Sequence, residues 1–260
     1  MRFSSSCAFI SAPRGHNITH IILPFNSEDI GHSMITRTHV TRRQQAQLLN
    51  SILDQALLNP TSSHRHQIQQ LIPTHHVEKL VERLRKRAII LSKQQPYQRH
   101  SILEARDALI LTLYAAAAPR GWACAWCDGS YIKIDAQQRA GIGAILMDDQ
   151  GEIVARIGQA IGAQDSFTAE LTAVVAIMQT ALKHDQRQLW VYCDNYGLIQ
   201  LWCEQRHDSR LAEIRRLAAT LDRFSLHPIP RQHNQPAHRL ALAATRCTDD
   251  VHVGISYKNI

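Results

Sequence analysis

Long apolar runs and a regular cysteine framework are both missing from this sequence. Apolar residues make up 45% of its 260 residues, enough to bury a core. No run approaches the roughly 18–20 apolar residues of a membrane span, so we expect no membrane partner. The six cysteines are irregularly spaced, which favours reduced thiols and a cytoplasmic protein. A continuous secretory signal core is also missing, although a serine-containing start without acids before Glu28 leaves an organelle-targeting peptide as the alternative.

The sequence also lacks the second ligand pair that a zinc site needs. Cys124 and Cys127 form a C-x-x-C pattern, but they stand in a run that reads as a strand. Side chains three residues apart on a strand point to opposite faces of its sheet. No further C-x-x-C or suitably spaced histidine pair follows, so we expect no zinc site here.

Acidic residues are scarce in the first half of the chain. Residues 1–120 hold 15 Lys and Arg against 7 Asp and Glu, whereas residues 121–260 hold 14 against 15. The basic excess therefore lies wholly in the N-terminal half of a chain long enough for two domains. A polyanionic partner such as nucleic acid fits this asymmetry, and so does an ordinary solvated helix surface.

The N-terminal half is predicted to hold a mobile arm (residues 1–40) and a small helical module (residues 41–118). Three- and four-residue spacing of apolar side chains predicts helices at about Thr41–Asn59, Thr74–Lys93 and Ser101–Ala118. The second helix carries basic residues on the face opposite its apolar stripe, among them Arg83, Arg85, Lys86 and Arg87. We predict that this basic helical module raises the affinity of the protein for nucleic acid.

After Gly121 the pattern of apolar residues changes from helical periodicity to strand-like runs separated by turn residues. Apolar runs and turn signals predict the order β-β-β-α-β-α-α-β-α over residues 121–246, with residues 247–260 as a tail. Asp148-Asp149-Gln150-Gly151 joins two of the predicted strands as a hairpin turn. The amphipathic pattern over Ser166–His184 predicts the main helix.

Three acidic residues stand where these predicted elements would bring them together. Asp128 lies in the first strand, Glu170 in the first turn of the main helix, and Asp194 at the end of a short buried strand. A carboxylate turned toward a core costs free energy unless it is paired or binds a metal. Three such groups need a common cation or must neutralise one another, and hard oxygen ligands of this kind suit Mg²⁺ or Mn²⁺.

Five phrases in order and spacing resemble type 1 ribonuclease H, particularly its shorter bacterial, archaeal and plant-type members. They are D-G-S at 128–130, G-I-G-A-I-L at 141–146, T-A-E-L at 168–171, Y-C-D-N at 192–195 and I-P-R-Q-H-N-Q-P-A-H-R-L-A-L-A-A at 229–244. The resemblance covers about half of the chain. It implies an α/β (α+β) fold, in which helices flank a mixed five-stranded sheet.

The resemblance also implies an activity, which is cleavage of the RNA strand of an RNA–DNA hybrid with two Mg²⁺ or Mn²⁺ ions per active site. Asp128 would bridge both ions, and Glu170 and Asp194 would complete their sites. The products would carry 5′-phosphate and 3′-hydroxyl ends, and the ribose 2′-hydroxyls would mark the strand to be cut. The matching substrate-binding positions are Gly129, Ser130, Ser166 and Asn195, with Arg231 and His233 in the loop before the last helix.

The chain departs from the family at one position. His238 stands where the family places a fourth aspartate in N-x-x-A-D-x-L-A. An imidazole there could take part in the metal site and favour Mn²⁺, or accept a proton near neutral pH. Alternatively, the replacement weakens catalysis and leaves a ribonuclease H-fold protein that binds RNA or hybrid with little or no turnover.

Overall fold

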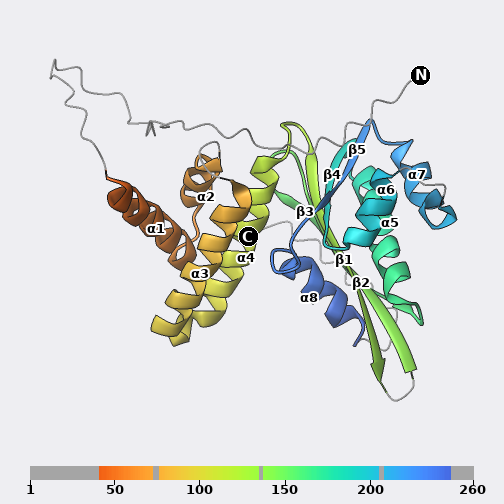
Figure 1. The fold of residues 1–260 in the computed structure, drawn as a ribbon, viewed down its shortest axis with the longest axis horizontal. Helices are drawn as coiled ribbons and strands as arrows, with labels where there is room; N and C mark the ends of the chain where they lie inside the picture. The colour runs from red at the N-terminus through yellow and green to blue at the C-terminus, as the bar shows by residue number, and fades with distance from the viewer. Residues whose placement is uncertain (1–40, 73–75, 135–136, 205–207, 247–260) are drawn as a thin grey trace. The chain divides into compact units, whose positions relative to one another are not determined.

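The computed structural model describes residues 41–72, 76–134, 137–204 and 208–246 (Figure 1). The predicted arm (1–40) and tail (247–260) lie outside the described residues. The chain divides into two compact units, Met1–Arg106 and Asp107–Ile260. The division falls inside a helix, some residues before the Pro119-Arg120-Gly121 segment at which the sequence pattern changes.

The N-terminal unit is helical. Its elements are α1 (Arg42–Leu58), α2 (Ser62–Gln69), α3 (Val77–Gln94), the 3₁₀ turn η2 (Pro96–Gln98) and the first part of α4 (Arg99–Ala117). A capping box between Thr41 and Gln44 starts α1, since each side chain receives a backbone N–H of the other residue. The sequence pattern did not predict α2, whose one buried residue, Ile68, leaves no apolar periodicity to detect.

The C-terminal unit contains the predicted mixed five-stranded sheet. Its strands are β1 (Ala123–Ile134), β2 (Gln137–Met147), β3 (Ile153–Gly162), β4 (Gln188–Cys193) and β5 (Arg223–Pro228). They lie in the order β3-β2-β1-β4-β5. The β1–β2 and β2–β3 pairs are antiparallel, whereas β1–β4 and β4–β5 are parallel. The fold class expected from the sequence is therefore confirmed.

Helices cover both faces of this sheet. They are α5 (Ser166–Lys183), α6 (Tyr196–Cys203), the 3₁₀ turn η3 (Ser209–Leu211), α7 (Ala212–Ala218) and α8 (Gln235–Ala244). Two glycines let helices approach the sheet backbone: a Cβ on Gly129 would lie 2.3 Å from the backbone nitrogen of Glu170 in α5, and one on Gly143 would lie 2.1 Å from the backbone oxygen of Ala237 in α8. Gly143 of β2 pairs with Asp128 of β1, so these two residues face the same side of the sheet. Gly129 is the next residue along β1 and faces the other side, so α5 and α8 pack on opposite faces.

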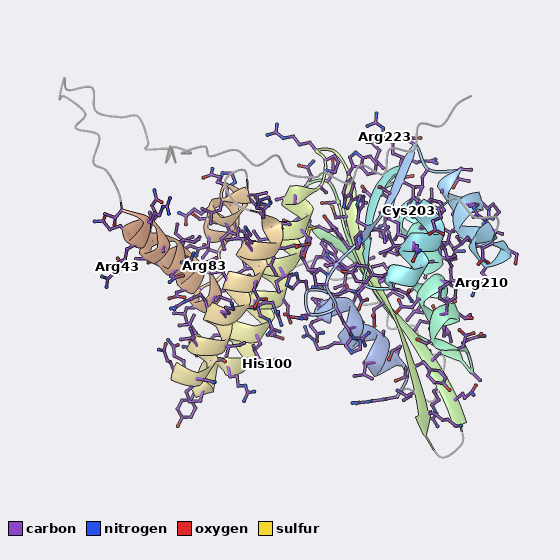
Figure 2. The ribbon with its side chains drawn as sticks, in the orientation of Figure 1. Arg43, Arg83, His100, Cys203, Arg210 and Arg223 are labelled. Atoms are coloured by element: carbon purple, nitrogen blue, oxygen red, sulfur yellow. The ribbon has the colours of Figure 1, made fainter. Side chains whose placement is uncertain are left out.

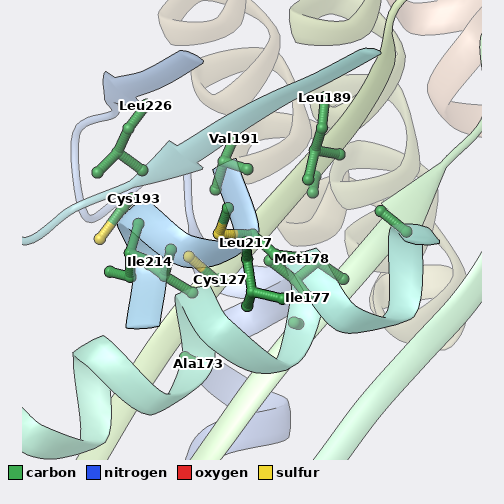
Figure 3. Close-up of a cluster of buried hydrophobic side chains, with 14 of the residues drawn as sticks. Cys127, Ala173, Ile177, Met178, Leu189, Val191, Cys193, Ile214, Leu217 and Leu226 are labelled. Atoms are coloured by element: carbon green, nitrogen blue, oxygen red, sulfur yellow. The ribbon is translucent and has the colours of Figure 1, made fainter. Parts of the chain in front are cut away.

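The core between the sheet and α5 is apolar and contains two cysteines. Figure 3 labels Cys127 and Cys193 in this cluster, together with Ile177 of α5 and Leu217 of α7. The opposite face carries Cys124, whose thiol contacts the backbone oxygen of Ala115. Cys124 and Cys127 therefore lie on opposite faces of β1. Among the described helices, none combines the length and the apolarity needed to cross a bilayer.

Candidate metal centre

The parallel pairing of β1 with β4 brings two aspartates together. Cys127 pairs with Cys193 in the last register position of this ladder, and each cysteine is followed by an aspartate, Asp128 or Asp194. The carboxyl ends of neighbouring parallel strands meet at one edge of a sheet, which is where α/β proteins usually place their ligands. The two Cys-Asp dipeptides thus become spatial neighbours although 66 positions separate them in the chain.

The third carboxylate comes from the first turns of α5. Asp165 caps this helix by accepting the N–H of Thr168 at 2.9 Å, which fixes where the helix begins and where Glu170 points. Gly129 has no side chain and lets α5 approach β1, and its backbone N–H donates to Glu170 Oε2 at 3.1 Å. Glycine after Asp128 is therefore required by this helix contact.

Asp128, Glu170 and Asp194 form one cluster. They each offer an oxygen, and these atoms all lie within 4.8 Å of one another. Asp128 is fully buried, and its Oδ1 has no hydrogen-bond partner. A buried, unpartnered carboxylate oxygen is costly, so the cluster calls for a cation or for protons.

Burial and mutual repulsion make two of these acids hard to ionise. Burial, reinforced by the charge of Asp194, raises the pKa of Asp128 to about 6, and a hydrogen bond from His238 opposes that rise. Burial also raises the pKa of Glu170 to about 8, helped by the charges of Asp128 and Asp194 and opposed by the Gly129 N–H. A bound divalent cation would stabilise the ionised form of both carboxylates.

The donor set fits a hard divalent cation. All three groups are carboxylates, which suit Mg²⁺ and Mn²⁺ better than the softer metals that prefer sulfur or imidazole. The orphaned Oδ1 of Asp128 provides an oxygen that no protein donor occupies. Asp128, Glu170 and Asp194 are therefore the residues that would hold the metal.

His238 reaches the cluster from the second turn of α8. Its Nδ1 lies 2.9 Å from Asp128 Oδ2, and its side chain is 21% exposed. With Asp128 ionised, Nδ1–H donates to the carboxylate, and the remaining nitrogen, Nε2, can accept a proton or a ligand. The residue at the family's fourth acidic position thus lies in the cluster and contacts its most buried carboxylate.

Asn234 also supports the cluster, and the sequence pattern did not single it out. Its buried side-chain amide donates to Asp194 Oδ1 at 3.0 Å and to the backbone oxygen of Cys127 at 2.9 Å. One amide therefore ties the turn before α8 to both β1 and the Asp194 carboxylate. The available signal was its place in the I-P-R-Q-H-N phrase, four residues before His238.

The two predicted loop residues, Arg231 and His233, have different surroundings. Arg231 is exposed, and its guanidinium lies 3.7 Å from Asp194 Oδ2 at the edge of the cluster. His233 is buried, and its Nδ1 forms a 2.7 Å hydrogen bond with the Tyr114 hydroxyl. The substrate-binding role of both remains a prediction, and His233 would have to leave a buried partner to perform it.

The other predicted substrate positions lie within four residues of a carboxylate in the sequence. Ser130 is buried in β1, Ser166 is exposed at the start of α5, and Asn195 is partly buried after β4. The Asn195 side-chain oxygen caps α6 by accepting the N–H of Leu198 at 3.0 Å. The Gly129 N–H is already bonded to Glu170. A substrate at these positions would have to use their other groups.

Four basic residues of α3 have partners within the N-terminal unit, and Figure 2 labels one of them, Arg83. Arg83 donates to Asn50 Oδ1 at 2.8 Å and to the backbone oxygen of Ala46 at 2.9 Å. Arg87 forms a two-pronged ion pair with Asp54, whose carboxylate raises the pKa of this arginine. Both arginines therefore join α3 to α1. Glu82 pairs with the two remaining residues of the predicted basic face, Arg85 and Lys86.

This site and sheet define a ribonuclease H-like α/β domain whose acidic cluster comes from β1, from the start of α5 and from the end of β4. Residues 127–244 match the family model described as reverse transcriptase-like, and they include all three clustered carboxylates together with Asn234 and His238. The matched segment is 118 of the 260 residues and lies within the C-terminal unit. No curated protein matches the chain significantly.

Solved structures with a similar fold include several ribonuclease H proteins. Ribonuclease H1 from the halophilic archaeon Halobacterium salinarum NRC-1 is 24% identical and covers 48% of this chain and 97% of its own, with a TM-score of 0.44. The N-terminal ribonuclease H domain of a Mycobacterium tuberculosis protein is 22% identical, covering 47% and 98%, with a TM-score of 0.41. LC11 ribonuclease H1, solved with an RNA/DNA hybrid, is 18% identical, covering 47% and 96%, with a TM-score of 0.42.

Proposed function

We propose that this protein is a metal-dependent endoribonuclease that cleaves the RNA strand of RNA–DNA hybrids and leaves 5′-phosphate and 3′-hydroxyl ends. The observation that carries the proposal is the cluster of Asp128, Glu170 and Asp194, with oxygens within 4.8 Å of one another. The family match over residues 127–244 supports the same reading.

Each residue of the cluster has a role in this reaction. Asp128, Glu170 and Asp194 would hold two Mg²⁺ or Mn²⁺ ions. When bound, such ions neutralise the scissile phosphate and activate water for in-line attack. Asn234 keeps the Asp194 carboxylate oriented, and Arg231 offers a cation to a phosphate beside it. His238 holds Asp128 through Nδ1 and has Nε2 free to accept a proton from water.

The test is cleavage of a hybrid labelled on its RNA strand, with Mg²⁺ or Mn²⁺. We expect metal-dependent cutting of that strand, abolished in Asp128→Asn, whose amide has nearly the shape of the carboxylate but no charge. Duplex RNA and single-stranded RNA serve as comparison substrates, since the family's selectivity depends on the hybrid. Tight binding of hybrid by the wild-type protein without metal-dependent cleavage would contradict the proposal.

A second candidate function is favoured by the His238–Asp128 contact. The His238 imidazole donates a 2.9 Å hydrogen bond to Asp128 Oδ2 and so competes with a metal ion for that oxygen. Unlike an aspartate, the imidazole adds no negative charge to the site. The domain could then bind RNA or hybrid with little turnover. This reading predicts equal hybrid affinity with and without divalent metal and no effect of Asp128→Asn on binding.

The N-terminal unit is proposed to raise affinity for nucleic acid. Lys86 has a side chain that is 70% exposed, compared with 23% for Arg85, and both residues pair with Glu82. Arg83 and Arg87 add positive charge to this surface, and their side chains also bond to residues of α1. Phosphate contacts from this surface would make hybrid affinity fall steeply with salt.

A further inference from the structure

The last turns of α4 belong to the same compact unit as the carboxylate cluster, although they lie outside the family match. Tyr114 is buried there and contacts His233 and Tyr192. Its hydroxyl hydrogen-bonds His233 Nδ1 at 2.7 Å, and its backbone oxygen accepts the hydroxyl of Tyr192 at 3.0 Å. The Tyr114 and Tyr192 rings meet edge to face at 5.0 Å. One residue of α4 therefore contacts two segments of the catalytic domain.

Both of these segments lead directly to the carboxylates. Tyr192 lies on β4 two residues before Asp194, and its hydroxyl is the donor in the bond to the Tyr114 backbone oxygen. His233 directly precedes Asn234, whose amide holds Asp194 and the backbone of β1. The turn containing His233 is closed by its own N–H, which donates to the backbone oxygen of Pro230 at 2.7 Å. Movement of the His233 ring would therefore move Asn234.

A second contact joins α4 to α8. Asp107 is buried and forms an ion pair with Arg239, the residue after His238. Asp107 and Tyr114 are seven residues apart, which places them on the same side of the helix, two turns from each other. The helix α4 thus contacts His233, just before Asn234 in the sequence, and Arg239, just after His238.

We propose that Tyr114 is a positioning residue for the metal centre: through His233 it fixes the Asn234 amide and thereby the Asp194 carboxylate. Residues around a metal ligand tune affinity by holding that ligand in one orientation, and here the support comes from a helix upstream of the family's own domain. The effect on metal binding rests on the proposed function, whereas the effect on Asn234 does not.

The test removes the hydroxyl alone, with Tyr114→Phe in the full chain. The first measurement is hydrogen exchange of the Asn234 side-chain amide by NMR without metal, with the signal assigned by Asn234→Asp. The second is Mn²⁺ affinity by calorimetry, and the third is kcat and KM on hybrid. We expect faster amide exchange and weaker Mn²⁺ binding, each by about 2- to 10-fold, the factor that one neutral hydrogen bond represents. The value of kcat should fall while KM stays constant.

Matched variants separate positioning from packing. Tyr97→Phe makes the same change at a fully exposed tyrosine in η2 and should leave all three measurements unchanged. His233→Leu should reproduce the effects of Tyr114→Phe, and it replaces that variant if the phenylalanine protein does not fold. His233→Asn should restore Asn234 protection, because its amide offers a donor or acceptor near the position of Nδ1.

The outcomes distinguish this proposal from the proposed function. Wild-type Asn234 exchange in Tyr114→Phe, even with a lowered Tm, would overturn the positioning role and leave Tyr114 as a packing residue. Faster Asn234 exchange in a protein whose wild type binds no Mn²⁺ would support the positioning role while refuting the metal-dependent nuclease. Faster exchange together with weaker Mn²⁺ binding supports both.

Discussion

At the scale of single residues, burial of the clustered acids lowers the folding stability of the metal-free protein as pH rises. The pKa of Glu170 rises to about 8 in the folded protein because of burial and its acidic neighbours. As pH rises from the ordinary glutamate pKa toward 8, the unfolded chain releases this proton while the folded protein retains it, so folding stability falls over that window. Bound metal reverses the penalty because it stabilises the ionised form.

We predict that Glu170→Gln stabilises the metal-free protein at alkaline pH. The amide keeps an oxygen to accept the Gly129 N–H and removes the unfavourable charge. Its Tm near pH 8 should exceed that of the wild type by about 2–8 °C, the shift that one kcal/mol produces in domains of this size. Thermal unfolding at pH 5 and pH 8 checks the sign, since the difference should shrink at pH 5. A lower Tm for the variant at pH 8 would contradict the electrostatic account.

His238→Asp tests the departure from the family at the same scale. A fourth carboxylate next to Asp128 would replace a nitrogen donor with a hard oxygen, which Mg²⁺ prefers. We expect kcat/KM with Mg²⁺ to rise about 10-fold or more relative to Mn²⁺, the scale on which groups around a metal act. His238→Asn, which adds no charge, is the control. If the ratio of kcat/KM with Mg²⁺ to kcat/KM with Mn²⁺ did not change, His238 would have no role in the metal-dependent step.

At the scale of elements, the position of α8 depends on a glycine in β2. A Cβ on Gly143 would lie 2.1 Å from the Ala237 backbone oxygen and 2.3 Å from the Ala241 backbone nitrogen. These are backbone atoms of the helix that carries His238, so they cannot yield without moving the helix. The separation between α8 and the sheet, and with it the His238–Asp128 contact, is set by this missing side chain.

Gly143→Ala should therefore lower the free energy of unfolding by about 3 kcal/mol or more through overpacking. The matched control is Gly158→Ala in β3, where the nearest atom to the new Cβ is 3.6 Å away. That variant should change the free energy by less than about 1 kcal/mol. Urea denaturation of both, followed by Mn²⁺ titration of the folded proteins, makes the comparison. Equal stability of the two variants would show that α8 is free to shift.

At the scale of the whole molecule, α4 serves both compact units. The division between them falls between Arg106 and Asp107, within this helix. A truncation that ends at the predicted module boundary, residue 118, would therefore remove Asp107 and Tyr114 together with the basic helices. A truncation of residues 1–98 retains both of these residues.

We predict that removal of residues 1–98 weakens hybrid binding and flattens its dependence on salt, because Lys and Arg side chains that contact phosphate are lost. Unfolding of the C-terminal unit should stay cooperative in this variant. Removal of residues 1–118 should in addition lower Tm and Mn²⁺ affinity. Binding isotherms at several salt concentrations, with calorimetry, provide the data. Unchanged hybrid affinity after removal of 1–98 would assign the N-terminal unit to a structural or partner-binding role.

Local pattern in the sequence was sufficient for the strands and for α5, whereas the meeting of Asp128, Glu170 and Asp194 was expected from the resemblance to ribonuclease H. Strand alternation, helical periodicity and turn residues act over a few positions, so they predict single elements but not the strand order that brings β1 beside β4. The polar helix α2 lacks such a pattern and was missed. The predicted boundary between residues 118 and 121 stays a prediction, and the division into compact units falls between Arg106 and Asp107 within α4.

Only the tertiary structure decided how the cluster is held. Tyr114 meets His233 across 119 positions of sequence, and Arg87 meets Asp54 across 33. Nothing in the local composition of either partner specifies such a pair, because a hydrogen bond depends on where two distant segments pack. The acids of the candidate metal centre could thus be predicted from the sequence, whereas the contacts that orient them are seen only in the folded structure.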